Sequence, residues 1–246
     1  MTNKYMYFIA NWKMYGSTSS VNSLNKVIKF SKSKEINMGR LIYCPPYTLI
    51  SSFSKKFQNC QIGLGGQNCH ESETDGPFTG FVNARMLKNA GAQFVIIGHS
   101  ENREKGESDK LINLKIKSAI NSKLKVIFCI GETLSEKRKK ITNKILSNQI
   151  NNGLKSIKDI SKIIIAYEPV WSIGTGLIPK SNDLVNSISY IKSKFAKKTP
   201  KVLYGGSVNN KNIAQLKDIN VIDGFLIGGA SQSPKKFIDI IKKTFN

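Results

Sequence analysis

The stretch that decides the fold is Ile163-Ile164-Ile165-Ala166-Tyr167-Glu168-Pro169-Val170-Trp171-Ser172-Ile173-Gly174-Thr175-Gly176. An apolar run rich in β-branched residues leads directly into Glu168, which is typical of a strand that is buried on both faces and ends in a carboxylate. Proline stiffens the start of the loop that follows, and the two glycines of Gly-Thr-Gly give its end freedom. Such a loop can close over Glu168 and exclude water from it. The alternative is an ordinary loop with a solvated glutamate.

Short strand-like runs recur along the whole chain. They cover residues 5–11, 41–44, 61–65, 94–98, 126–130, 163–168, 202–206 and 225–228, with helical spacing between them, for example at 21–30, 84–90 and 144–157. Eight buried strands alternating with helices in 246 residues predict an α/β fold, the (β/α)8 barrel, rather than an open sheet. No linker or composition break divides the chain, so we expect one domain over residues 1–246. The first strand is not followed by GxGxxG, which argues against dinucleotide binding.

The chain is strongly basic, with 38 Lys and Arg against 16 Asp and Glu and a net charge of +22. Nucleic-acid-binding proteins have such a balance. However, the lysines are scattered through helical segments that also carry apolar stripes, and the densest run, at 136–140, contains no aromatic residue. We therefore interpret the charge as solvated helix faces and expect no nucleic-acid partner. The positive field would assist capture of a small dianionic substrate.

Several features predict a cytoplasmic protein. The apolar N-terminal run is too short for a secretory signal and continues into polar residues without a cleavage site. No stretch approaches the roughly 18 apolar residues of a membrane helix. The four cysteines lie far apart without CxxC pairing, so reduced thiols are expected rather than disulfides. No cluster has metal-ligand spacing, so we expect neither a metal nor a cofactor.

Active sites of these barrels lie at the carboxyl ends of the strands. The residues that fall there are Asn11, Lys13, His99, Glu168, Gly205-Gly206-Ser207 and Gly228-Gly229. Glu168 is suited to act as a general base when water is excluded from it. Lys13 can balance an anionic substrate or a developing enediolate.

His99 and the glycine pairs have both a functional and a plain structural interpretation. His99 precedes Ser100 and Glu101, which read as a helix start, and the positive end of a helix favours a neutral imidazole. A neutral ring can donate to a carbonyl oxygen, although a lone histidine can equally be structural. The glycine pairs can hold a phosphate through backbone N–H groups or can simply form turns. The second histidine, His70, lacks placement at a strand end and is expected on a loop surface.

With these residues in place, the chain resembles the triosephosphate isomerase family over its full length. The resemblance is carried, in order, by Asn-Trp-Lys-Met at 11–14, Gly-His-Ser-Glu at 98–101, Tyr-Glu-Pro-Val-Trp at 167–171, Gly-Thr-Gly at 174–176, Tyr-Gly-Gly-Ser at 204–207 and Gly-Gly-Ala-Ser at 228–231. Each segment is weak by itself, and six in register are specific. The resemblance implies a TIM barrel that interconverts dihydroxyacetone phosphate and glyceraldehyde 3-phosphate in glycolysis and gluconeogenesis, without a cofactor.

The resemblance also implies residue roles. Glu168 would move the carbon-bound proton, His99 would act as a neutral electrophile, and Asn11 and Lys13 would bind substrate, with Glu101 supporting the site from behind. The backbone at Gly174, Ser207, Gly228 and Gly229 would hold the phosphate as a lid at 169–179 closes. Trp171 would contact Glu132, and Tyr204 would contact the lid. Gln67, Asn68 and the loop through Thr79 would form a homodimer contact.

The chain departs from the usual family pattern at a few positions: Tyr15, Phe81, Asn102, Ser172 in the lid and Pro179 at its far hinge. Two other functions remain open. One is a different phosphate-binding barrel isomerase, which would be expected to lack the Glu168 lid together with His99. The other is a basic nucleic-acid-binding or surface-binding protein on a barrel scaffold, against which Lys13, His99 and Glu168 argue.

Overall fold

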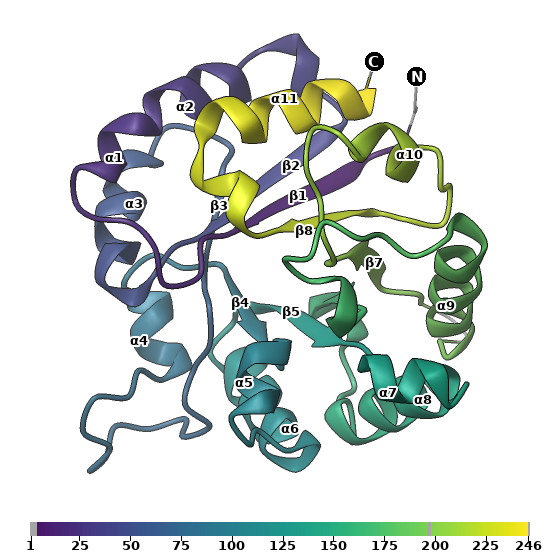
Figure 1. The fold of residues 1–246 in the computed structure, drawn as a ribbon. Helices are drawn as coiled ribbons and strands as arrows, with labels where there is room; N and C mark the ends of the chain where they lie inside the picture. Colours follow the sequence, from purple (N-terminus) through teal and green to yellow (C-terminus); the bar gives the residue numbers. More distant parts are fainter. Residues whose placement is uncertain (1–3, 196–197, 246) are drawn as a thin grey trace.

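Among residues 4–195 and 198–245, which the computed structural model describes, eight parallel strands close into a barrel in chain order (Figure 1). The strands are β1 (Met6–Asn11), β2 (Gly39–Cys44), β3 (Gly63–Gly66), β4 (Phe94–Ile97), β5 (Lys125–Ile130), β6 (Ile163–Tyr167), β7 (Lys201–Tyr204) and β8 (Gly224–Ile227). β8 pairs with β1, with Phe8 opposite Phe225, and this pairing closes the barrel. The predicted (β/α)8 fold is therefore confirmed.

Helices surround the barrel, as Figure 1 shows. They are α1 (Ser20–Ser23), α2 (Asn25–Ser31), α3 (Ile50–Lys56), α4 (Ala84–Asn89), α5 (Ser100–Glu104), α6 (Asp109–Asn121), α7 (Leu134–Arg138), α8 (Thr142–Gly153), α9 (Ser181–Ser193), α10 (Ile213–Lys217) and α11 (Pro234–Phe245). Short 3-10 turns lie at η1 (Lys34–Ile36), η2 (Tyr47–Leu49), η3 (Ile160–Lys162), η4 (Val170–Ser172) and η5 (Gly229–Gln232). Within the described residues, we find no helix long and apolar enough to span a bilayer.

Each strand is apolar throughout because it is buried on two sides. Along β1, Phe8 and Ala10 pack toward the helices while Ile9 belongs to a second apolar cluster. That second cluster takes side chains from all the strands except β3, and we assign it to the barrel interior: Ile9, Ile42, Cys44, Phe94, Ile96, Ile127, Cys129, Ile164, Ala166, Leu203 and Leu226. Alternate residues thus fill the interior and the layer beneath the helices.

Two predicted helices have different bounds in the structure. The segment with helical spacing at 21–30 is helical in two pieces, α1 and α2, which are divided at Leu24, whose N–H bonds to the carbonyl of Val21 three residues back. The helix predicted at 144–157 ends at Gly153. Ser156 there has a left-handed φ of 65°, which a helix cannot accommodate. The Gly153 carbonyl has no hydrogen-bond partner within the helix because the helix ends there, and the Asn113 side-chain amide donates to it.

Candidate active site

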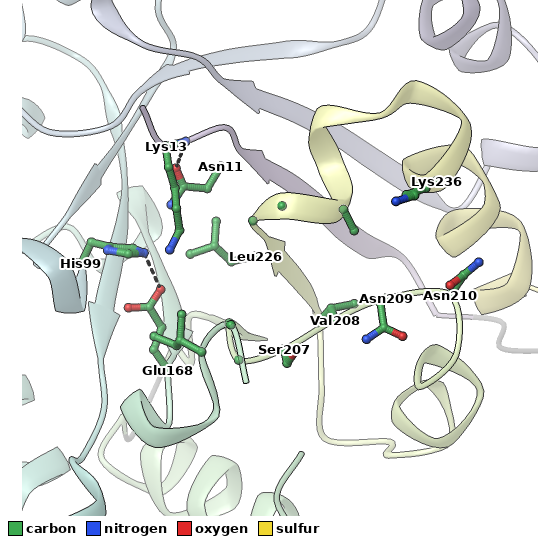
Figure 2. A pocket seen from close by; sticks show the side chains of 17 residues that line it. Asn11, Lys13, His99, Glu168, Ser207, Val208, Asn209, Asn210, Leu226 and Lys236 are labelled. Atoms are coloured by element: carbon green, nitrogen blue, oxygen red, sulfur yellow. Dashed lines mark hydrogen bonds and ion pairs between the residues drawn. The ribbon is translucent and has the colours of Figure 1, made fainter. Parts of the chain in front are cut away.

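The carboxyl ends of the strands surround a cavity of about 360 Å³. It is lined by the predicted residues Asn11, Lys13, His99, Glu168, Gly174, Ser207, Gly228 and Gly229. Figure 2 shows Lys13, His99 and Glu168 together at one end, with Asn209, Asn210 and Lys236 at the other. The fold therefore joins residues from β1, β4, β6, β7 and β8 that are far apart in sequence.

Glu168 is buried at the end of β6, with 1% of its surface exposed. Its N–H donates to the carbonyl of Ile130 on β5 (2.7 Å), which fixes the backbone at the strand end. One carboxylate oxygen accepts from the Ser100 N–H (3.3 Å), and the other lies 3.4 Å from His99 Nε2. The alternative of a solvated loop glutamate is wrong, and the carboxylate stands desolvated against the imidazole.

The His99 ring has a defined orientation at the start of α5. Its Nδ1 accepts the Glu101 N–H (3.3 Å), so Nδ1 carries no proton in this arrangement. The proton of the neutral ring is then on Nε2, which faces Glu168 and the cavity (Figure 2). The helix start predicted at Ser100 is confirmed, and it presents His99 as a hydrogen-bond donor to whatever occupies the cavity.

Lys13 has a left-handed backbone, with φ of 55°, which is uncommon for a residue with a side chain. Two contacts hold it: its N–H donates to Asn11 Oδ1 (3.1 Å), and its carbonyl accepts from the Gln67 amide (2.8 Å). This role of Gln67 was not predicted, because the sequence does not show that the end of β3 reaches the loop after β1. The constrained backbone directs the Lys13 ammonium toward the catalytic end of the cavity (Figure 2).

Glu101 is the one predicted site residue outside the cavity wall. Its side chain is 54% exposed, forms an ion pair with Lys13 and borders an adjoining cavity of about 300 Å³. Partial burial acts to raise the pKa of its carboxyl, but the hydrogen bond from Lys13 and the nearby basic groups together lower it. Glu101 therefore stays ionised and restrains the lysine from the side.

Two residues of the predicted lid at 169–179, Ile173 and Gly174, line the cavity that Glu168 also lines. Gly174 and Gly176 have φ of 73° and 78°, so the Gly-Thr-Gly turn requires glycine at both places. The lid contacts that the resemblance implied are present: Trp171 Nε1 donates to Glu132 (3.0 Å), and the Ser172 and Tyr204 hydroxyls are 2.9 Å apart.

Glu132 anchors the first half of the lid from a buried position, with 1% of its surface exposed. Burial raises the pKa of its carboxyl, while the hydrogen bonds from Trp171 and Tyr167 act in the opposite direction. The Lys137 ammonium lies over the Trp171 ring, 3.8 Å from its centre. The indole is thus held by a hydrogen bond and by a cation.

Backbone turns after β7 and β8 form the far end of the cavity. In η5 the N–H and hydroxyl of Ser231 both donate to the Gly228 carbonyl (2.9 and 2.7 Å), which shapes the turn at Gly228 and Gly229. Lys236, in the first turns of α11, lines this end and was not predicted. Its only sequence signal is its position a few residues after the glycine pair, in a chain rich in lysine. A positive end of this kind suits an anion.

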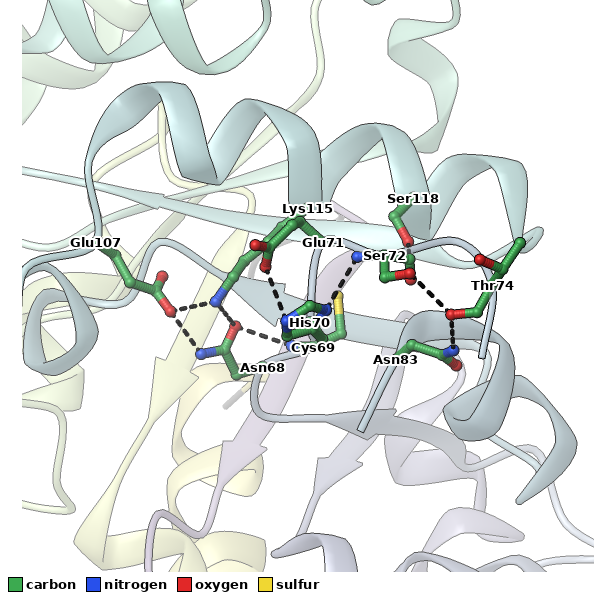
Figure 3. Close-up of polar contacts among 10 residues, drawn as sticks. All are labelled: Asn68, Cys69, His70, Glu71, Ser72, Thr74, Asn83, Glu107, Lys115 and Ser118. Carbon is green, nitrogen blue, oxygen red and sulfur yellow. Dashed lines mark hydrogen bonds and ion pairs between the residues drawn. The ribbon is translucent and has the colours of Figure 1, made fainter. Parts of the chain in front are cut away.

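His70 was expected on a loop surface, and it lies on the loop between β3 and α4 but is less exposed than expected. Its side chain is 11% exposed, and its ring packs 4.3 Å from the ring of Phe78. Figure 3 shows it among ordered polar contacts, where His70 Nδ1 accepts the Ser72 N–H (3.1 Å). The loop between β3 and α4 folds back on itself and covers the ring, which position in the sequence could not indicate.

The described residues contain no group of three or more His, Cys, Asp or Glu side chains that could hold a metal. The side chains that line the cavity include one carboxylate (Glu168), one imidazole (His99) and two ammonium groups (Lys13 and Lys236), beside the backbone turns. These groups can move a proton to and from a carbon next to a carbonyl and hold an anionic group at the far end.

Comparison with known proteins gives one family. A family model described as "Triosephosphate isomerase" matches residues 6–244. A triosephosphate isomerase of Dictyoglomus thermophilum is 39% identical over 244 residues, covering 95% of this chain and 97% of the relative. That of Prosthecochloris aestuarii is 38% identical over 247 residues, covering 95% and 96%. The crystal structure of the Bartonella henselae triosephosphate isomerase is 35% identical, with a TM-score of 0.87, and covers 96% of this chain and 97% of that one.

Proposed function

Because the chain belongs to the triosephosphate isomerase family, we propose that Glu168, His99, Lys13 and Asn11 carry out the reaction of that family. This reaction interconverts dihydroxyacetone phosphate and D-glyceraldehyde 3-phosphate, as part of glycolysis and gluconeogenesis. The observation that carries the residue assignment is the pair formed by the buried Glu168 carboxylate and the Nε2 of His99, 3.4 Å apart at the end of one cavity.

The proton path follows from this pair. Glu168 takes a proton from the carbon beside the carbonyl, and the bonding electrons pass to the carbonyl oxygen, giving an enediolate. The Nε2–H of His99 donates to that oxygen and passes protons between the two neighbouring oxygens. Glu168 then returns the proton to the adjacent carbon. The Lys13 ammonium stabilises the negative charge that develops, and Asn11 orients both the substrate and the backbone of Lys13.

The phosphate group binds at the opposite end. The N–H groups of Gly174, Ser207, Gly228 and Gly229 hold it, because all four residues line this cavity and glycine places no side chain between backbone and ligand. Closure of the lid over it excludes water from Glu168. Glu101 takes no part in proton transfer and restrains Lys13.

A coupled assay with glyceraldehyde 3-phosphate, without added metal or nucleotide, tests this assignment directly. We expect turnover in wild type, loss of turnover in Lys13→Ala and little change in Lys235→Ala. Lys235 is exposed and does not line the cavity, so it is a matched control for removal of one positive charge. Equal activity of both variants would contradict the role of Lys13.

We also propose that the chain is a single (β/α)8 domain over residues 1–246 that forms a homodimer. Support for the dimer comes from apolar side chains on the loops after β1 and β3 that are 94% (Met14), 59% (Tyr15) and 63% (Phe81) exposed. Large exposed apolar side chains on neighbouring loops are typical of an interface.

Salt distinguishes an apolar dimer contact from an ionic one. The chain has Phe81 and Asn102 where the family pattern has Glu and Arg, so the contact loses a charge pair without leaving one charge unpaired. With +22 on each chain, added salt reduces repulsion, and we expect the dimer to persist or tighten. Light scattering at micromolar protein over a range of salt measures this. An active monomer, or a dimer that dissociates as salt rises, would contradict it.

A cytoplasmic location is the last part of the proposal. It is supported by four free cysteines, three of them buried, as expected where thiols stay reduced. Fractionation of the source cells, with the isomerase activity followed through each fraction, would test it.

A further inference from the structure

The hydroxyl of Ser172 joins three segments of the chain at one buried point of the lid. Ser172 is fully buried, and its Oγ lies 2.8 Å from the Leu177 carbonyl in the second half of the lid. The same oxygen lies 2.9 Å from the Tyr204 hydroxyl at the end of β7. It lies 3.3 Å from the Ser207 nitrogen in the turn after β7. Lid and anion-binding turn thus meet at a single oxygen atom.

The direction of each hydrogen bond follows from the groups involved. A serine hydroxyl has one proton and two acceptor sites. The Leu177 carbonyl can only accept, so the Ser172 proton goes there, and the Tyr204 hydroxyl donates to Ser172 Oγ. Burial raises the pKa of Tyr204 to about 12 despite its bond to Ser172, so it keeps the proton that it donates. The Ser207 N–H takes the second acceptor site, and the hydroxyl is fully used.

Hydrogen bonds within the lid link the residues that follow Ser172. The Thr175 hydroxyl donates to the Ser172 carbonyl (3.2 Å) and accepts the Leu177 N–H (3.2 Å). Residues 172–177 therefore form a ring of hydrogen bonds, and the Ser172 hydroxyl is the point at which this ring attaches to Tyr204 and Ser207.

The packing at Gly206 is a separate indication that these groups are placed closely. A Cβ at Gly206 would lie 2.3 Å from the Tyr204 hydroxyl oxygen and 2.6 Å from Ser172 Oγ. The backbone between Tyr204 and Ser207 therefore runs directly against the two hydroxyls. This approach brings the Ser207 N–H within reach of Ser172, and it is possible only with glycine at 206.

We propose that Ser172 is a positioning residue whose hydroxyl sets the lid and the Ser207 N–H together, and so determines affinity for the phosphate group of the substrate. The proposal rests on the assignment of Ser207 to phosphate binding made above. The bond from Ser207 (3.3 Å) holds that N–H in place beside the lid, and the N–H can be shared between Ser172 Oγ and a phosphate oxygen as a three-centre hydrogen bond. The bonds to Leu177 and Tyr204 then keep the lid in register. Ser172 is not among the residues that line the cavity.

The test is Ser172→Ala, measured with inorganic phosphate as the probe by calorimetry and by inhibition of turnover. Loss of the hydroxyl leaves the Leu177 carbonyl and the Ser207 N–H without their partner. We expect the dissociation constant for phosphate and the KM for dihydroxyacetone phosphate to rise at least about fivefold, while kcat changes less than about threefold, because Glu168 and His99 are untouched.

Ser118→Ala is the matched control. Ser118 is also fully buried, and its hydroxyl donates to the Ser72 carbonyl (3.4 Å; Figure 3), so its partner belongs to the loop after β3 and not to the lid. We expect phosphate affinity within about twofold of wild type. If Ser172→Ala lowers the unfolding temperature as Ser118→Ala does and leaves phosphate affinity unchanged, Ser172 is merely structural and the proposal fails.

A double-mutant cycle separates a shared network from independent effects, and it also provides a milder variant should Ser172→Ala fold poorly. Tyr204→Phe removes one donor and leaves the serine, so we expect phosphate affinity to fall about threefold. The double variant should resemble Ser172→Ala alone, because both changes break the same bond. The proposal would be overturned if the loss of phosphate affinity in the double variant equalled the product of the losses in the two single variants. It would also be overturned if Tyr204→Phe lost no phosphate affinity. A wild-type protein that binds phosphate without turnover would instead contradict the function proposed above.

Discussion

Replacement of the proposed base, Glu168→Gln, tests the mechanism most directly. Glutamine has the size and shape of glutamate, so it fits a site where the side chain is 2% exposed. It has no basic oxygen, and general-base catalysis contributes roughly 100- to 10,000-fold. The buried position also limits access of water as a substitute base. We expect kcat to fall at least about 1,000-fold, which corresponds to about 4 kcal/mol in the activation barrier.

The contacts of Glu168 also set the expected effect on stability. The carboxylate presents one oxygen to the Ser100 N–H and the other to His99 Nε2, so both oxygens face donors. Glutamine has one oxygen and one NH2 group. Its NH2 group therefore faces either the Ser100 N–H or the Nε2–H of His99, and two donors cannot form a hydrogen bond. An unmade buried hydrogen bond costs about 1–3 kcal/mol. For a chain of this size that lowers the unfolding temperature by roughly 2–4 °C per kcal/mol.

Phosphate binding is the control for this variant. Ser207 lies apart from Glu168 in the cavity, on the side of Asn209 (Figure 2). We therefore expect the dissociation constant for inorganic phosphate, measured by calorimetry, to stay within about threefold of wild type. A variant that keeps a tenth of the wild-type turnover would refute the assignment of the base. A loss of phosphate affinity as large as the loss of kcat would refute the separation of the two ends.

Three other predictions follow from the same structure. His99→Gln should lower kcat far more than phosphate affinity, and equal losses would make His99 a binding or structural residue. Pro179→Ala frees the far hinge of the lid and should change kcat only a few-fold, with altered lid rates in stopped-flow fluorescence of Trp171; unchanged rates would exclude a hinge role. Asp223 is 3% exposed. Burial acts to raise the pKa of its carboxyl, but hydrogen bonds from Lys192 and other donors outweigh burial and lower it. Its ionised form therefore stabilises the fold above pH about 4, and this contribution is lost as the pH falls further. In urea unfolding, the free energy of unfolding should fall less on acidification in Asp223→Asn than in wild type, and identical falls would refute the argument.

Much of the fold could be read from the sequence because its signal is local. The run Ile163–Tyr167 is apolar at every position, since a strand of a parallel barrel is buried on both faces. The alternation of such runs with helical segments leaves few arrangements, and the eight predicted strands appear in the structure. The positions of Asn11, His99 and Glu168 follow from the rule that strand ends share one rim.

Helix ends and packed loops were not determined in this way. The turn at Leu24 and the left-handed Ser156 depend on how each segment meets its neighbours, and propensity alone does not specify either. His70 looks like any polar loop residue until the loop folds back over its ring. For His70 the contacts with the rings of Phe78 and Phe81 decide how far the side chain is exposed, and no local preference specifies those contacts.

The sequence by itself therefore determined the barrel and which residues lie at its rim. Apolar runs along the chain indicate the buried strands, and their alternation with helical segments indicates the strand order. Only the tertiary structure decided what those residues contact. It gave His99 its protonated nitrogen toward Glu168 through the Glu101 N–H, and it tied the backbone of Lys13 to Gln67. It also placed the hydroxyl of Ser172 between lid and anion-binding turn. Hydrogen bonds act over about 3 Å, and a one-dimensional pattern carries no distances between segments that folding alone brings together.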